Sequence, residues 1–127
     1  MTRLVDTSAW IELLSGSALV PLIRAELPAP GDWLVPTIVQ FELSKWLIRE
    51  MSEDRAREAI AFSTTCAVIE LDTAIALLAA ELGARYRLSI ADAVIYATAS
   101  AFEAELLTCD RHFEGLPGVR YIPKSGV

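Results

Sequence analysis

The sequence has few residues of the kinds that build disulfide frameworks or zinc sites. Its 127 residues include two cysteines, Cys66 and Cys109, and one histidine. A small disulfide-stabilised domain needs more cysteines, and a four-ligand zinc site needs more thiol and imidazole groups than the chain contains. We therefore expect neither thiol chemistry nor zinc chemistry.

Long hydrophobic runs and linkers are also lacking. No uncharged apolar run approaches the roughly 18 residues that span a bilayer. Arg3 and Asp6 interrupt the N-terminal region where a signal peptide has its apolar core. The densest cluster of helix-breaking residues is the short run 28–31. These features predict a cytoplasmic protein with no membrane segment, folded as a single domain over residues 1–127.

Positive charge is scarce as well. Eleven basic residues against seventeen acidic ones give a net charge of −6, the wrong sign for non-specific binding of nucleic acid. An acidic chain can still hold a nucleic acid if a divalent metal neutralises the carboxylates nearest the phosphates, so a nuclease is not excluded. Hydrophobic residues make up 54% of the chain, and this surplus predicts that some apolar surface contacts another subunit or a partner.

Short apolar runs alternate with segments of helical periodicity. Strands are expected at 3–5, 33–35, 67–69, 106–108 and 121–122, and helices after Asp6, over 18–27, over 38–50, over 52–62, after Asp72 and after Ser89. Residues 37–40 and 89–92 have the form of capping boxes. This alternation predicts an α/β fold, a three-layer α/β/α sandwich with a mostly parallel central sheet of four to five strands.

Two acidic residues follow expected strands directly. Asp6 comes after Val5, and Asp110 lies two residues beyond Thr108. Ligands of an open parallel sheet bind outside the carboxyl ends of its strands, where both carboxylates should project. Asp is also a preferred helix cap and turn residue, which would explain either residue alone.

Two further acidic residues lie on helices with apolar surroundings. Glu42 has Ile38, Val39 and Trp46 one turn away, although a surface ion pair with Lys45 would also explain it. Asp92 is the third residue of a helix that is apolar nearly all round. A capping box with Ser89 would account for Asp92, but a buried charge also needs a partner or a metal.

The four carboxylates of Asp6, Glu42, Asp92 and Asp110 would repel one another if they met unpaired. Oxygen ligands of this kind suit Mg²⁺ or Mn²⁺, which also bind phosphate oxygens, so the pattern indicates cleavage of a phosphate ester. Thr108 or Ser8 could hold a water at such an ion, although both are common as plain turn and cap residues.

Four motifs together resemble a known family. They are 6–10 (DTSAW), 36–43 with Glu42, 88–93 (LSIADA) and 107–113 (LTCDRHF). The chain resembles a PIN-domain ribonuclease, and more narrowly a VapC-type toxin of a toxin–antitoxin pair. The resemblance implies a compact α/β sandwich, a homodimer, RNA cleavage that depends on Mg²⁺ or Mn²⁺, and inhibition by a VapB-type antitoxin whose tail covers the active site. It implies catalytic and metal-binding roles for Asp6, Glu42, Asp92 and Asp110, with Thr108 as a supporting polar residue.

One position departs from that resemblance. Some relatives have another acid two residues after the fourth one, where this chain has His112, which puts a second metal site in doubt. We expect His112 to be a surface residue rather than a metal ligand or a substrate contact. Arg85, Arg87 and Arg111 are candidates for binding RNA phosphates, although arginines at helix ends are usually solvated or paired. The alternative function is a non-catalytic PIN-like module for RNA binding or assembly.

Overall fold

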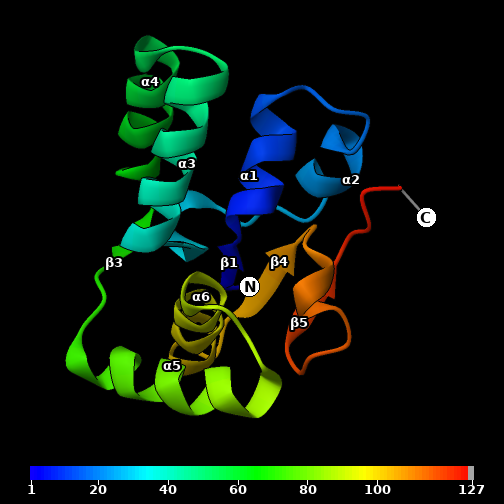
Figure 1. The fold of residues 1–127 in the computed structure, drawn as a ribbon. Coiled ribbons are helices and arrows are strands. Elements are labelled where there is room, and N and C mark those ends of the chain that lie inside the picture. The colour runs from blue at the N-terminus through cyan, green and yellow to red at the C-terminus, as the bar shows by residue number, and fades with distance from the viewer. Residues whose placement is uncertain (126–127) are drawn as a thin grey trace.

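The computed structural model describes residues 1–125, and its elements alternate along the chain as the sequence predicts (Figure 1). The strands are β1 (Arg3–Val5), β2 (Trp33–Pro36), β3 (Ala67–Ile69), β4 (Glu105–Thr108) and β5 (Val119–Tyr121). The α-helices are α1 (Thr7–Leu14), α2 (Val20–Arg24), α3 (Thr37–Glu50), α4 (Glu53–Ser63), α5 (Thr73–Tyr86) and α6 (Ile90–Ala101). Two short 3-10 turns, η1 (Pro30–Asp32) and η2 (Arg111–Phe113), precede β2 and β5.

The five strands form one sheet in the order β3-β2-β1-β4-β5. Every strand pair is parallel, and Leu4 of β1 lies opposite both Leu34 of β2 and Leu106 of β4. The buried stretches of β1, β2 and β4 are mostly apolar, as is typical of a parallel sheet covered on both faces. The predicted α/β fold is therefore confirmed.

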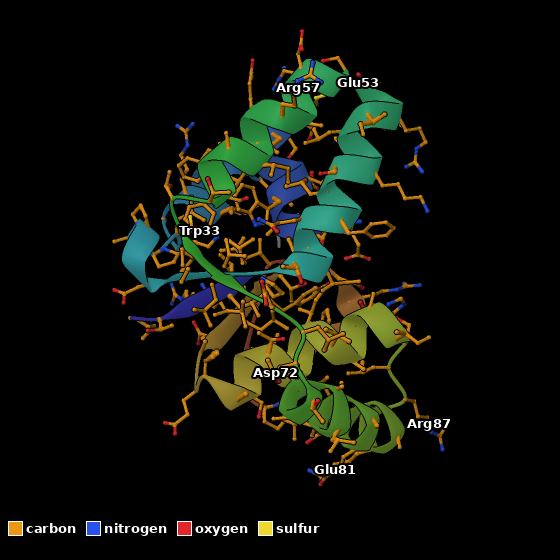
Figure 2. The ribbon with its side chains drawn as sticks, turned by 90° about the vertical axis from the view of Figure 1, so that its left-hand side faces the viewer. Trp33, Glu53, Arg57, Asp72, Glu81 and Arg87 are labelled. Atoms are coloured by element: carbon orange, nitrogen blue, oxygen red, sulfur yellow. The ribbon has the colours of Figure 1, made fainter. Side chains whose placement is uncertain are left out.

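The direction of the chain across the sheet explains the three layers. Crossovers between parallel strands are right-handed, so the path from β1 through β2 to β3 keeps α1 to α4 on one face. The return from β3 to β4 reverses that direction and places α5 and α6 on the other face, as Figures 1 and 2 show. The reversal point lies between β1 and β4, and crevices that bind ligands form at such points.

The hydrophobic core lies on both faces of the central strands. Leu4, Val5, Leu106 and Leu107 have no solvent exposure, and Val35 is nearly as buried. Helix α6 is buried along most of its length, over residues 93–99, as its apolar sequence predicts. A Cβ added at Gly83 of α5 would lie 3.1 Å from the Cβ of Ala93, so glycine at this position permits the close approach of α5 to α6. Among the described residues, no helix combines the length and apolar character needed to cross a membrane.

Local structure departs from the sequence predictions at three points. The helix predicted over 18–27 is confined to α2, because Glu26 and Leu27 donate to carbonyls three residues back in tight turns. The capping box predicted at 37–40 is wrong. Helix α3 begins at Thr37 itself, after the extended Pro36, and the Gln40 amide donates to Ser63 at 3.0 Å instead. The last strand spans Val119–Tyr121, so it begins two residues and ends one residue earlier than the predicted range 121–122.

Candidate active site

Asp6 lies at the carboxyl end of β1, where its carboxylate is almost completely buried. Its Oδ1 accepts a hydrogen bond of 2.8 Å from the backbone N–H of Thr7. Its Oδ2 accepts hydrogen bonds from the hydroxyls of Ser8, at 2.8 Å, and Thr108, at 2.7 Å. These three donors fix the orientation of the carboxylate.

The electrostatic state of Asp6 is unusual. Burial raises the pKa of Asp6 to about 6, although the hydrogen bonds from Thr108 and Ser8 oppose that rise. The negative charges of Asp92 and Asp110 contribute to this raised pKa, because each disfavours another charge nearby. The structure therefore brings three of the predicted acids within electrostatic range of one another.

The hydroxyls of Ser8 and Thr108 hold Asp6 and join the ends of β1 and β4. Thr108 is fully buried, and its Oγ accepts from the N–H of Asp110 at 2.9 Å while its proton goes to Asp6. Ser8 Oγ accepts from the N–H of Cys109 at 3.0 Å and also donates to Asp6. Both hydroxyl protons are thus engaged by Asp6, so this geometry favours a positioning role over the holding of a water.

Glu42 contributes a carboxylate from the second turn of α3. Its Oε1 accepts a hydrogen bond of 2.8 Å from the hydroxyl of Thr7, the residue next to Asp6. Lys45 is exposed, and within the described residues it forms no ion pair with Glu42. The geometry therefore supports the placement of Glu42 at the strand ends rather than a surface pair with Lys45.

Asp92, Asp110 and His112 meet beside these residues. The Nδ1 atom of His112 lies 3.2 Å from Asp92 Oδ2 and 3.3 Å from Asp110 Oδ1. One potential ligand atom from each of the three residues lies within 4.8 Å of the others. Burial and the charge of Asp110 raise the pKa of Asp92, whereas His112 lowers it. His112 is exposed as predicted, but it is not merely solvated, because it contacts two of the candidate acids.

Arginine ion pairs hold several carboxylates elsewhere in the described structure, but they hold none of the candidate acids. Arg3 pairs with Glu26 at 2.9 Å and with Glu105 at 2.8 Å. Arg57 lies 3.7 Å from Glu53, at the end of the molecule where Figure 2 shows both side chains. In contrast, no described lysine or arginine forms an ion pair with any of the four candidate acids. Carboxylates without a lysine or arginine partner fit a hard divalent cation, which would offset their repulsion.

Two surface hollows meet at His112. Arg87 lines the first, together with Asp92, and Figure 2 shows Arg87 pointing outward from the end of α5. Arg111 lines the second, together with Asp110, Tyr121 and Lys124. Two of the three predicted RNA-binding arginines thus flank the acids. The third, Arg85, pairs with Glu81 at 3.0 Å and lines neither of these hollows.

Sequence reasoning missed two contacts of this site. The hydroxyl of Thr7 holds Glu42, and His112 bridges two acids that are 18 positions apart. The sequence did offer a signal for each: Thr7 directly follows Asp6, and His112 lies two residues after Asp110. Neither identifies its partner without the fold.

Comparison with known proteins gives a consistent assignment. The family model described as "PIN domain" matches residues 3–119. A structure of a toxin–antitoxin complex from Klebsiella pneumoniae aligns with a TM-score of 0.80 and 29% identity, covering 94% of this chain and 96% of that one. The sarcin-ricin loop cleaving toxin VapC20 of Mycobacterium tuberculosis aligns with a TM-score of 0.76 and 23% identity, over 93% and 97% of the two chains. The DNA-bound VapBC complex of Salmonella typhimurium aligns with a TM-score of 0.75 and 19% identity, over 95% and 96%. No curated protein sequence matches the chain.

Proposed function

Because the chain belongs to the PIN-domain family, we propose that it is an endoribonuclease dependent on Mg²⁺ or Mn²⁺ and the toxin of a VapC-type toxin–antitoxin pair. One observation carries the proposal. Asp6, Asp92 and Asp110, which have no lysine or arginine partner among the described residues, lie within electrostatic range of one another near the point where the strand order of the sheet reverses, and Thr7 holds Glu42 next to Asp6. This is the position at which open parallel sheets bind ligands.

In this proposal Asp6, Asp92 and Asp110 hold the divalent ion, and Glu42 completes the acidic set from the opposite layer. Carboxylate oxygens are the ligands that Mg²⁺ and Mn²⁺ prefer. When bound, such an ion polarises a phosphate and lowers the pKa of a water, which makes that water a better nucleophile at neutral pH. The raised pKa of Asp6 fits this role, since a buried carboxylate near two others is poorly stabilised without a cation.

The remaining polar residues of the site orient the acids and the RNA. Ser8 and Thr108 fix Asp6, and Thr7 fixes Glu42, so neither carboxylate has to be reoriented for binding. Arg87 and Arg111 line the two hollows that share His112, where each could bind a phosphate of one RNA strand. We assign RNA contacts to these two arginines and not to Arg85, which Glu81 engages.

The proposed partners are a VapB-type antitoxin and a second copy of the chain. Support for the antitoxin comes from the aligned toxin–antitoxin complexes, each of which matches this chain over nearly its whole length. Support for self-association comes from exposed apolar side chains such as Phe41 and Ile48 on α3 and Ile90 at the start of α6.

Cleavage is tested by incubating the purified chain with total RNA in Mg²⁺, in Mn²⁺ and in chelator. We expect cleavage with either ion and none in chelator, and Asp92→Asn should abolish it. Glu70→Gln is the matched control, because Glu70 is exposed and remote from the acids in sequence. RNA binding without cleavage under either ion would favour the non-catalytic module.

The toxin assignment has a separate test. Expression of the chain alone should slow bacterial growth, and expression of Asp92→Asn should not. Co-expression of the neighbouring reading frame should restore growth if that frame encodes the antitoxin. Growth unaffected by an active ribonuclease would contradict the toxin role while leaving the enzymatic one intact.

A further inference from the structure

We propose that His112 is itself a ligand of the divalent ion, through Nδ1, and that this nitrogen makes the site select Mn²⁺ over Mg²⁺. The inference rests on the proposed metal site formed by Asp92 and Asp110. It adds His112 to the four acids as a fifth residue of the site and predicts how His112 affects the choice of metal.

The spacing of the donor atoms supports a shared ion. Neighbouring ligands of an octahedral ion with bonds of about 2.1 Å lie about 3 Å apart. His112 Nδ1 lies 3.2 Å from Asp92 Oδ2 and 3.3 Å from Asp110 Oδ1, close to that separation. Each of the three residues offers one ligand atom within 4.8 Å of the others, so one ion can contact all three residues together.

The backbone holds His112 in this position. The N–H of His112 donates to Asp110 Oδ1 at 2.9 Å, which makes Asp110 the cap of turn η2. Phe113, the next residue, is fully buried and anchors the turn in the core. The His112 side chain is 67% exposed, so water can satisfy its other ring nitrogen when Nδ1 binds a metal.

A nitrogen ligand changes which ion the site prefers. Mg²⁺ favours oxygen ligands and an ideal octahedral shell, whereas imidazole is a better ligand for transition metals. Mn²⁺ accepts both carboxylate and imidazole donors, so a site with His112 should discriminate against Mg²⁺ more strongly than one built from carboxylates alone.

A different role for His112 makes the opposite prediction. A protonated His112 would pair with Asp92 and Asp110 as an internal cation, and it would have to be displaced before a metal could enter. Removing such a cation would leave metal affinity unchanged or increase it. Removing a ligand would decrease it.

The first experiment measures the affinity of the untagged protein for Mn²⁺ and for Mg²⁺ by calorimetry, in wild type, His112→Ala and His112→Asp. In His112→Ala we expect Mn²⁺ affinity to fall at least ~10-fold and Mg²⁺ affinity to fall less. His112→Asp, which restores an oxygen donor, should retain binding but lose the preference for Mn²⁺. Equal or tighter Mn²⁺ binding in His112→Ala would overturn the inference.

The second experiment uses the wild-type chain and needs no variant to fold. His112 is the only histidine in the sequence, so an imidazole nitrogen signal in the pulsed electron paramagnetic resonance spectrum of bound Mn²⁺ has one source. We expect a directly coordinated ¹⁴N coupling that changes to the ¹⁵N pattern when histidine alone is ¹⁵N-labelled. Bound Mn²⁺ without this coupling would overturn the role of His112 and leave the proposed function intact. Absence of Mn²⁺ binding by the wild-type protein would overturn the metal site itself.

Discussion

The hydroxyl of Thr7 donates a hydrogen bond of 2.8 Å to Glu42 Oε1, and this contact ties α3 to the first turn of α1. Thr7 follows Asp6, so the bond holds the carboxylate of Glu42 beside the carboxyl end of β1. A glutamate on the outer face of α3 would have paired with Lys45 or solvent. The contact therefore distinguishes two roles for Glu42 that its sequence position allows equally.

Glu42→Gln should reduce metal-dependent RNA cleavage by at least ~100-fold. Glutamine keeps the shape of the side chain and can still accept from Thr7, but it lacks the charge that attracts a divalent ion. Cleavage rates measured over a range of Mn²⁺ concentrations should show partial recovery at high Mn²⁺, because concentration offsets weakened affinity.

Lys45→Met is the matched control for Glu42→Gln, since it removes the charge but keeps the apolar stem. Its cleavage rate should stay within a few-fold of wild type. Similar losses in both variants would instead identify the two residues as a functional ion pair and leave three acids in the site.

Asp92→Asn should raise the melting temperature of the metal-free protein by a few degrees. Burial and the charge of Asp110 raise the pKa of Asp92, so the ionised form of Asp92 opposes folding when no cation is present. Differential scanning calorimetry in chelator at neutral pH provides the measurement. Glu70→Gln should leave the melting temperature nearly unchanged, and a fall of several degrees in Asp92→Asn would show that Asp92 is chiefly a structural residue of the first turn of α6.

Light scattering of the purified chain at micromolar concentration should give about twice the monomer mass of 13.9 kDa. The physical reason is the apolar surface that the described residues leave uncovered, including Ile90, which is 86% exposed, and Phe41, which is 61% exposed. A monomer over the whole concentration range would contradict self-association and reserve this surface for a different partner.

Most of the fold could be predicted because its signals are local. The strands are short apolar runs, and Ser52, Asp72 and Ser89 each cap the helix that follows them, as expected. The capping box predicted at 37–40 does not form, because Pro36 is the extended residue before α3 and Thr37 is already inside the helix. A capping-box pattern forms a cap only when its first residue is the N-cap, the residue just before the helix.

The candidate acids could be singled out from the sequence, but the contacts that hold them could not. Strand ends and apolar neighbours indicated Asp6, Asp110, Glu42 and Asp92, because both are properties of the local sequence. The contact of His112 with Asp92 depends instead on η2 and α6 meeting in space. A contact between residues so far apart in the chain cannot be predicted from their spacing in a single sequence.

The stability of the metal-free protein should depend on pH through Asp6. Its pKa is about 6 in the folded protein, against an ordinary value of 3.8, so the folded state retains a proton that the unfolded state has lost between these pH values. Stability must then fall as pH rises from about 4 to about 6, and change no further above that range. The loss is at most about 3 kcal/mol, since each unit of pKa corresponds to about 1.4 kcal/mol.

Other carboxylates also titrate in this range, so the contribution of Asp6 is isolated by comparison with Asp6→Asn. Urea unfolding in chelator at several pH values between 4 and 8 gives the free energy of unfolding of both proteins. Asparagine does not titrate, and any change in its hydrogen bonds with Ser8 and Thr108 adds an offset that is independent of pH. Wild type should therefore lose stability relative to Asp6→Asn as pH rises to about 6, and the difference should then stay constant. A difference that is flat across the range would mean that Asp6 remains ionised in the folded protein at pH 4, and that its three hydrogen-bond donors outweigh the effect of burial.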